Sequence, residues 1–324
     1  MNATNKYIPQ PDKAALQAVY SMLRQRPALG RFTEERLKAF RAQPRPEIKM
    51  SHRVELLTIP GPEGDVPIRI VWPAKAPVAV QISVHAGGWC MGSAEANDWL
   101  NDIVAEKCQV ATVGIDYRLA PEHPYPAALT DILAVAVWLR DAGPALFGTD
   151  RLLIYGSSAG AHLASQMLLR LRDEQPDLLA RVAAVGLSYG AYDIGKSPSM
   201  RLVPDDSLVV RREVHDGFLD FAFPGLDAEG RRNSAISPLY ARLNGLPPAL
   251  FTVGNLDPLL DDTLFMAARW QAAGNTAELD VWPECIHLFD AFEPITGRAF
   301  AERLSAWFNT FLDRESLGEL KSVT

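Results

Sequence analysis

A serine suited to nucleophilic catalysis lies in the segment Gly156-Ser157-Ser158-Ala159-Gly160. A short apolar run over residues 152–155 precedes this segment, and a helical pattern over residues 159–171 begins directly after it. A serine on a tight turn between a strand and a helix presents its hydroxyl oxygen above the sheet, and flanking glycines let neighbouring chain segments approach closely. Only Ser158 has glycine two positions away on both sides, so we predict that Ser158, and not Ser157, is the nucleophile. An ordinary turn between a strand and a helix is the alternative interpretation.

Backbone donors for an oxyanion are expected in the segment His85-Ala86-Gly87-Gly88-Trp89, which follows the apolar run over residues 78–84. Adjacent glycines expose backbone N–H groups, and acyl transfer needs such groups around its developing negative charge. The N–H of Ala159, at the start of the helix after Ser158, favours negative charge at the same place. A glycine-rich turn without a catalytic role stays open as an alternative. A phosphate-binding loop is disfavoured because no Gly-Lys-Ser/Thr follows.

The general base is sought among the three histidines that follow Ser158. His287 lies after the strand-like residues 279–282, near the C-terminus, where the order Ser, Asp or Glu, His of α/β hydrolases places the base. A neutral imidazole near pH 7 can accept the serine proton and return it to the leaving group. His162 lies one turn into the helix after Ser158 and is predicted to be a local hydrogen-bonding residue. His215 is predicted to lie on the surface.

The carboxylate that orients the base is predicted to be Asp257. It lies in the turn that follows the apolar run over residues 250–253, between the serine and the histidine in chain order. Asp261 and Asp262 are alternatives, although both are typical of acidic residues in the first turn of a helix. Asp193, which follows another apolar run, is a further alternative.

The elements that must position these residues follow from the apolar patterning. Residues 14–23 show helical spacing, and residues 54–59 and 66–71 flank a Gly/Pro turn, which predicts an antiparallel hairpin. Five short apolar runs then alternate with helical patterns, which predicts a mostly parallel sheet covered on both faces. The apolar runs are 78–84, 110–115, 152–155, 182–187 and 250–253, and the helical patterns are 127–139, 159–171, 263–273 and 298–312.

Residues 190–238 interrupt this alternation, since they contain charge clusters and aromatic residues but no clear strand. An insertion of this kind in an α/β domain is predicted to form a cap over the active site. The aromatic residues Phe218, Phe221 and Phe223 either form the core of this cap or line an acyl channel.

Taken together, five segments resemble the hormone-sensitive lipase family of α/β-hydrolases, and the likeness covers residues 75–312. They are His85-Ala86-Gly87-Gly88-Trp89, Asp116-Tyr117-Arg118-Leu119-Ala120-Pro121-Glu122-His123-Pro124, Gly156-Ser157-Ser158-Ala159-Gly160, Asp257-Pro258-Leu259 and His287-Leu288-Phe289. The resemblance implies an α/β-hydrolase fold, with a mostly parallel central sheet of about eight strands, helices on both faces and a helical cap. It also implies three parts, which are an N-terminal cap segment (1–50), a catalytic core (51–190 and 236–324) and a cap insertion (191–235).

The resemblance further implies that carboxylic esters are cleaved by a serine triad through an acyl-enzyme. Carried over position by position, the triad consists of Ser158, His287 and Asp257. The oxyanion N–H groups are those of Gly87, Gly88 and Ala159. Residues that match positions which usually brace the loops around the site are His85, Tyr117 and Glu122. Residues expected at the substrate pocket are Trp89, Ser157, Leu288 and Phe289.

The chain departs from the family pattern at three positions. Ala86 replaces the first glycine of the usual His-Gly-Gly-Gly, and its methyl group restricts φ. Ser157 replaces an aspartate beside the nucleophile, which removes a charge. Leu288 replaces the glycine of His-Gly-Phe and is expected to narrow the pocket. We expect these changes to affect the choice of substrate more than the type of reaction.

Composition limits the partners of the chain. It has 324 residues, 48% of them hydrophobic, and a net charge of −7 without blocks of Lys or Arg, which argues against nucleic acid. Three scattered cysteines form neither a disulfide framework nor a CxxC metal motif, and no histidine pair has metal-ligand spacing. No GxGxxG segment follows a strand. We therefore predict no cofactor and no metal.

The predicted location is the cytoplasm. Residues 1–7 lack the pattern of a signal peptide, and the apolar stretch 129–139 is too short to span a bilayer. The predicted partner is a small-molecule ester of small to medium acyl chain, and a homodimer stays open.

Other functions remain open on the residues alone. The same triad could cleave an amide, as arylformamidases do, or a lactone. A non-catalytic receptor on this fold is disfavoured because His287 completes the triad. A membrane-active lipase is disfavoured because no amphipathic anchor helix is apparent.

Overall fold

A single eight-stranded sheet forms the centre of the protein in the computed structural model, which describes residues 8, 11–25, 30–44 and 48–312. The strand order is β1-β2-β4-β3-β5-β6-β7-β8. The strands are β1 (Val54–Ile59), β2 (Val66–Val71), β3 (Val80–Val84), β4 (Ala111–Ile115), β5 (Leu152–Ser157), β6 (Val182–Ser188), β7 (Ala249–Gly254) and β8 (Ala277–Trp282). All the predicted strands are thereby confirmed.

The sheet is mostly parallel. Strand β2 runs antiparallel to both of its neighbours, β1 and β4, and the predicted hairpin pairs Val54 with Val71 and Ile59 with Val66. Every pairing from β4 through β8 is parallel. The carboxyl ends of the parallel strands therefore meet along one edge of the sheet, where ligands bind in open α/β sheets.

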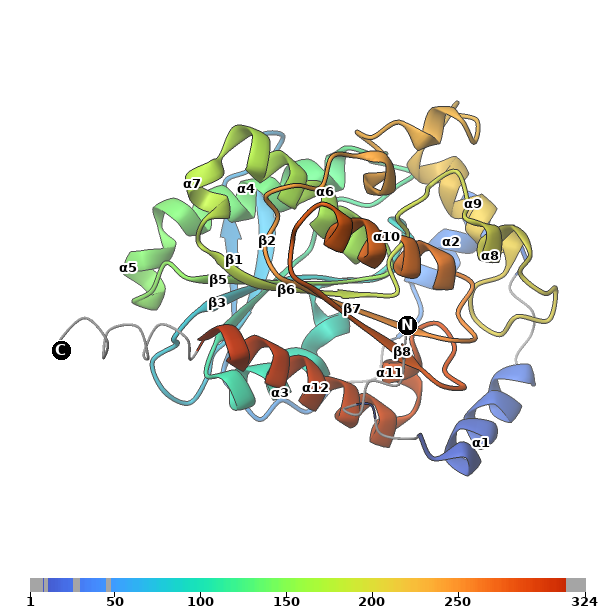
Figure 1. Cartoon of the computed structure of the whole chain (residues 1–324), viewed down its shortest axis with the longest axis horizontal. Coiled ribbons are helices and arrows are strands. Elements are labelled where there is room, and N and C mark those ends of the chain that lie inside the picture. The colour runs from blue at the N-terminus through green and yellow to red at the C-terminus, as the bar shows by residue number, and fades with distance from the viewer. Residues whose placement is uncertain (1–7, 9–10, 26–29, 45–47, 313–324) are drawn as a thin grey trace.

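Helices cover both faces of the sheet, as predicted (Figure 1). Three long helices of one face, α4, α6 and α10, pack on one apolar core, and helices α3 and α12 of the other face pack on a second core. The helices are α1 (Lys13–Arg24), α2 (Glu34–Arg41), α3 (Asp98–Cys108), α4 (Ala127–Asp141), α5 (Gly143–Phe147), α6 (Ala159–Glu174), α7 (Pro176–Leu179), α8 (Pro198–Arg201), α9 (Arg212–Ala222), α10 (Leu260–Ala272), α11 (Phe289–Phe292) and α12 (Pro294–Leu312).

Two segments that are far apart in the sequence meet above the carboxyl ends of the strands. The Phe32 ring, which precedes α2, stacks on the Phe218 ring of α9 with 5.3 Å between ring centroids. Arg31 forms an ion pair with Asp220 of the same helix. The N-terminal segment and the insertion at residues 191–235 are therefore held together by an apolar contact and a charged contact.

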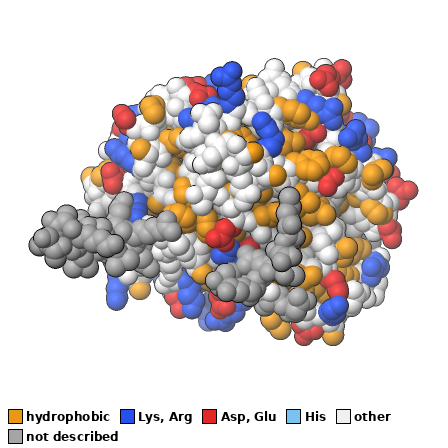
Figure 2. All heavy atoms as spheres, in the orientation of Figure 1, with side chains coloured by type: hydrophobic (Ala, Val, Ile, Leu, Met, Phe, Trp, Pro, Cys, Tyr) orange, Lys and Arg blue, Asp and Glu red, His pale blue; other side chains and the backbone are white. Residues whose placement is uncertain are grey.

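The surface in Figure 2 carries interspersed side chains of both charge signs, with apolar patches between them. Within the described ranges, no helix has both the length and the apolar composition that a membrane span requires. The segment 1–7, on which the prediction about a signal peptide rests, lies outside the described residues.

Candidate active site

Ser158 lies at the junction between β5 and α6 with φ of 54° and ψ of −120°, a conformation that non-glycine residues rarely adopt. Such strain costs about 1–3 kcal/mol and persists only where the surrounding structure holds it. The flanking glycine is required by packing, because a Cβ atom on Gly160 would lie 2.2 Å from the backbone oxygen of Val84. This close approach of α6 to the end of β3 brings the serine beside the loop that follows β3.

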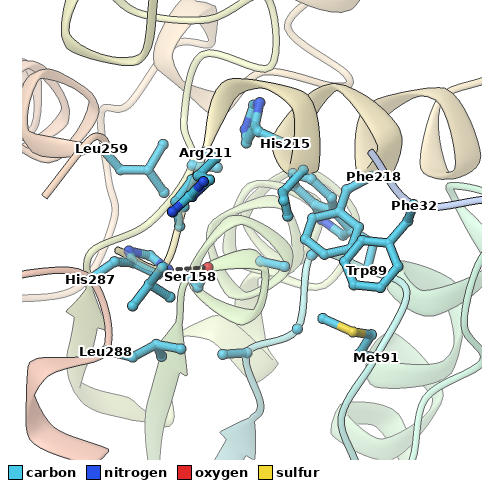
Figure 3. A pocket seen from close by; sticks show the side chains of 18 of the residues that line it. Phe32, Trp89, Met91, Ser158, Arg211, His215, Phe218, Leu259, His287 and Leu288 are labelled. Carbon is cyan, nitrogen blue, oxygen red and sulfur yellow. Dashed lines mark hydrogen bonds between the residues drawn. The ribbon is translucent and has the colours of Figure 1, made fainter. Parts of the chain in front are cut away.

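A continuous hydrogen-bond chain joins the three predicted triad residues. The Ser158 Oγ lies 2.9 Å from the His287 Nε2 (Figure 3). The His287 Nδ1 lies 2.8 Å from the Asp257 Oδ2. The other oxygen of Asp257 accepts the N–H of Leu259 at 2.8 Å, and its side chain is completely buried. The geometry therefore allows His287 to donate a hydrogen bond from Nδ1 to Asp257 and to accept one from the Ser158 hydroxyl at Nε2.

The other candidate acids have different partners. Asp262 accepts the N–H groups of Tyr192 and Asp193, each at 2.7 Å, and Asp261 accepts the N–H of Ser199 at 2.8 Å. Asp193 forms an ion pair with Arg232. Each of these carboxylates orders the segment after β6, and none of them is hydrogen-bonded to His287.

The loop that carries His287 is braced by residues that sequence reasoning missed. The Tyr189 ring packs edge-on against the His287 ring, with 4.9 Å between centroids, and its hydroxyl donates to Asp290 at 2.7 Å. Burial raises the pKa of Asp290 to about 6. The Tyr20 hydroxyl of α1 donates to the Glu284 carbonyl at 2.6 Å. No motif marks these residues, because they come together only through packing between distant segments.

The loop after β3 turns at Gly87, Gly88 and Trp89, which have φ values of 134°, 58° and 61°. A Cβ atom on Gly87 would lie 2.0 Å from the backbone oxygen of Met91, so no other residue fits there. Ala86 precedes the positive-φ stretch, and its methyl group therefore imposes no strain on the turn. Within the described part of the chain, the N–H groups of Gly87, Gly88 and Ala159 donate no hydrogen bond.

The base of this loop is held by His85 and Tyr117, in line with the bracing role expected for both. Their rings stack with 4.1 Å between centroids, and the Tyr117 hydroxyl donates to the His85 carbonyl at 2.9 Å. Glu122, the third expected brace, accepts two hydrogen bonds from Arg41. Arg41 also donates to the Cys90 carbonyl at 2.7 Å.

A cavity of about 740 Å³ opens directly above Ser158 and His287. Its apolar side is formed by Phe32, Met91, Trp89 and Phe218, which Figure 3 places to one side of the serine. The full lining comprises Leu23, Phe32, Phe40, Gln43, Ala86, Gly87, Gly88, Trp89, Met91, Ser158, Ala159, Ala191, Leu208, Val209, Val210, Arg211, Val214, His215, Phe218, Leu259, His287, Leu288 and Phe292.

Of the residues expected at the pocket, Trp89 and Leu288 line the cavity, whereas Ser157 and Phe289 do not. Ser157 is buried at the end of β5, and strand alternation points its side chain away from the face that Ser158 reaches. The Phe289 ring packs against Trp282 and Phe300 in the core beneath the sheet. The expectation for these two residues is therefore wrong, because the turn at Leu288 (φ 60°) directs the next side chain into the core.

The two other histidines that follow Ser158 in the sequence, His162 and His215, differ from each other. His162 is a local hydrogen-bonding residue as predicted, since its Nδ1 accepts from Trp89 at 3.0 Å and its Nε2 donates to the Ile236 carbonyl at 2.6 Å. His215 is not on the surface, and the prediction was wrong. Helix α9 packs its 214–218 face inward against the core and the cavity, which leaves His215 only 6% exposed. Desolvation lowers the pKa of each imidazole to about 4.

The comparisons with known proteins agree with this geometry. Residues 81–291 match the sequence profile of a family described by the α/β hydrolase fold. The chain belongs to that family. This α/β hydrolase is 32% identical over 271 residues to carboxylesterase NlhH of Mycobacterium tuberculosis. The match covers 79% of this chain and 83% of the relative. It is also 32% identical over 254 residues to the carboxylic ester hydrolase LipN of Mycobacterium tuberculosis, covering 76% and 66% of the two chains.

Solved structures show the same likeness over nearly the whole chain. A hyperthermophilic esterase from Pyrobaculum calidifontis superposes with a TM-score of 0.79 at 27% identity, covering 92% of this chain and 97% of that one. An esterase from the bacterial hormone-sensitive lipase family superposes with a TM-score of 0.77 at 28% identity, covering 94% and 100%. The predicted fold and family are thus confirmed, and this α/β hydrolase is a carboxylesterase of the hormone-sensitive lipase type.

Proposed function

We propose that this carboxylesterase cleaves esters through Ser158, His287 and Asp257. Support comes from the hydrogen-bond chain of 2.9 and 2.8 Å that runs from the serine hydroxyl through the imidazole to a buried carboxylate. His287 Nε2 takes the serine proton as Ser158 Oγ attacks the ester carbonyl carbon, and then returns it to the leaving alcohol. Asp257 holds the imidazole in the tautomer that this transfer requires. Water, activated by the same histidine, then releases the acyl group from Ser158.

The carbonyl oxygen becomes negatively charged during each attack, and we assign its stabilisation to Gly87, Gly88 and Ala159. Their N–H groups border the cavity at the serine, and Ala159 begins α6, whose positive dipole end favours the charge. Two or three such donors contribute several kcal/mol of transition-state stabilisation in acyl transfer, because each is worth about 3 kcal/mol.

The acyl group is assigned to the apolar side of the cavity, between Phe32 and Phe218 on one wall and Met91 on the other. A volume of about 740 Å³ lies within the range of small-molecule sites and suits acyl chains of small to medium length. We propose that residues 1–50 and 191–235 act together as a cap around this space, since the contacts of Phe32 with Phe218 and of Arg31 with Asp220 join them. The cytoplasmic location and the homodimer stay predictions from the sequence.

The test is hydrolysis of p-nitrophenyl esters from acetyl to decanoyl by the parent chain and by Ser158→Ala. The expected result is a loss of at least about 10⁴-fold in kcat for Ser158→Ala, with the parent most active on the shorter chains. Ser157→Ala is the matched control, because this neighbouring serine does not line the cavity and should keep activity within a few-fold. Serine-independent hydrolysis would contradict the proposal. A formyl arylamide and a lactone in the same panel test the alternative substrates.

A further inference from the structure

One face of the cap helix α9 contributes a polar edge to the otherwise apolar cavity. Arg211, Val214, His215 and Phe218 all line the cavity, at a spacing that places them on one side of a helix. Figure 3 shows Arg211 and His215 above Ser158, with Phe218 farther along the same helix on the apolar side. The cavity therefore offers two different environments to the two parts of a bound ester.

Arg211 is a cation without a carboxylate among the described residues. Its Nε donates to the Ser207 carbonyl at 2.9 Å, which leaves the terminal nitrogens of the guanidinium available for another acceptor. The other half-buried cations of the same insertion are paired, since Lys196 contacts Asp216 at 2.6 Å, Arg231 contacts Asp220 at 3.4 Å and Arg232 contacts Asp193 at 3.3 Å. The half-buried guanidinium of Arg211 thus differs from its neighbours in having no counter-charge.

His215 adds a second unsatisfied polar group at the same edge. The residue is 6% exposed, and neither of its ring nitrogens has a hydrogen-bond partner within the part of the chain that the structure describes. Burial lowers the pKa of this imidazole to about 4, so that at neutral pH the ring carries one N–H donor and one acceptor. Both nitrogens are inaccessible from the cavity, so the part of His215 that lines the cavity is apolar and excludes water beside Arg211.

We propose that Arg211, with the buried His215 beside it, forms a subsite for a carboxylate carried by the ester substrate. The guanidinium pairs with both oxygens of a carboxylate in the fork geometry typical of arginine. Helix α9 begins at Arg212, so the positive end of its dipole lies at this edge as well. The substrate class is then an ester with one free acid group, such as a half-ester of a dicarboxylic acid or an acylated hydroxy acid.

This inference rests on the proposed function and deepens it. The scissile ester is held at Ser158 while its distal carboxylate is held at the polar edge, and the apolar chain that joins them lies against the remaining cavity wall. The two pairs of probe esters described next decide whether the substrate carries its free acid in the acyl part or in the alcohol part.

The experiment compares kcat/KM by pH-stat for two matched pairs of esters. The first pair has the charge in the acyl part, and it compares monomethyl adipate, which has a free acid, with the neutral methyl ester of adipic acid monoamide. The other has it in the alcohol part: the butyrate ester of 3-hydroxypropanoate against that of 3-hydroxypropanamide. The expected result is a preference of about tenfold or more for the acid in at least one pair, as a charge-assisted hydrogen bond provides.

Two variants assign the preference to the subsite. Arg211→Gln should remove it by lowering kcat/KM for the acid about 10- to 100-fold, with the neutral amide ester changed less than about threefold. His215→Phe should leave the preference within about threefold of the parent, because the ring nitrogens of His215 do not reach the cavity. Arg212→Gln is the matched control, because this adjacent arginine is exposed and does not line the cavity.

The outcomes are separable from those of the proposed function. Hydrolysis of the neutral esters that depends on Ser158 tests the triad alone. If the parent shows no preference for the acid in either pair, or if the preference survives in Arg211→Gln, the carboxylate subsite is wrong even though the esterase proposal stands.

Discussion

Replacement of the buried His215 by phenylalanine is expected to stabilise the protein, and to do so more strongly in acid. At neutral pH the side chain buries two ring nitrogens that have no partner among the residues the structure describes. A phenyl ring of similar shape removes both unsatisfied groups, and the bordering cavity leaves room for its extra atoms. The expected gain in the free energy of unfolding at pH 7.5 is about 1–2 kcal/mol.

The stronger stabilisation expected at acidic pH follows from the pKa of His215. Burial is the main cause that lowers it from 6.5 to about 4; Asp216 opposes the shift, and the nearby Lys196 and Arg231 contribute to it. The unfolded chain therefore binds a proton between pH 6.5 and 4 that the folded chain does not bind. The stability contributed by neutral His215 is lost as the pH falls through this window, and linkage puts the loss at pH 4.5 at about 2–3 kcal/mol.

The parent alone does not reveal this effect, because two carboxyls act in the opposite direction. Burial raises the pKa of Asp262 to about 7 and that of Asp290 to about 6. Each of these groups binds its proton more tightly in the folded state, so its contribution to stability is largest in acid and is lost as the pH rises through the folded-state pKa. The difference between variant and parent cancels both carboxyls and isolates His215.

The assay is urea unfolding of parent and His215→Phe at pH 7.5, 6.0 and 4.5, with His123→Gln as the control at an exposed histidine. The stability difference between variant and parent should widen by about 2–3 kcal/mol from pH 7.5 to pH 4.5. A difference independent of pH would mean that His215 is solvated or paired in solution, and would refute the burial argument. The control should follow the parent at all three values.

Three further outcomes are expected. Asp257→Asn should lower kcat by about 10⁴-fold with little change in KM, because the amide favours the wrong His287 tautomer. Steady-state kinetics on p-nitrophenyl butyrate measures this change. Activity within tenfold of the parent would remove Asp257 from the triad. Gly160→Ala should lower the free energy of unfolding by at least about 2 kcal/mol in a urea titration, because the added Cβ would lie 2.2 Å from the Val84 carbonyl oxygen. Unchanged stability would contradict the packing argument. The Cys90 thiol, whose pKa burial raises to about 12, should react with a disulfide reagent at pH 8 only after unfolding in urea, so that rapid labelling of the folded chain at this residue would show it to be exposed.

Much of the fold and the core of the site could be predicted from local patterns. The central parallel strands from β3 to β7 could be found as mostly apolar runs because both faces of the sheet are covered there, and a buried parallel strand has no polar face to interrupt the run. Ser158 could be identified because a strained strand–turn–helix junction requires glycine where Gly160 approaches Val84. The assignment of His287 over His162 followed from chain order, and the hydrogen bonds of both histidines agree with it.

The errors share a physical cause. His215 was placed on the surface because a histidine among charged residues looks exposed, yet α9 turns that face inward onto the cavity. Phe289 was placed at the pocket because it follows His287 closely, yet the left-handed turn at Leu288 sends its ring into the core below the sheet. Adjacency in the sequence does not decide which side of a loop a residue faces.

The sequence by itself determined the positions of the strands along the chain and the glycine positions of the two loops, and it predicted the serine, histidine and aspartate that we propose as the triad. These depend on local sterics and on hydrophobic periodicity, both of which are written in neighbouring residues. Only the tertiary structure decided that Phe32 from the N-terminus joins Phe218 of the insertion, that Tyr189 braces the His287 loop, and that Arg211 borders the cavity without a counter-charge among the described residues. Such contacts link segments dozens to hundreds of residues apart, and their energies depend on burial and distance, which no short stretch of sequence specifies.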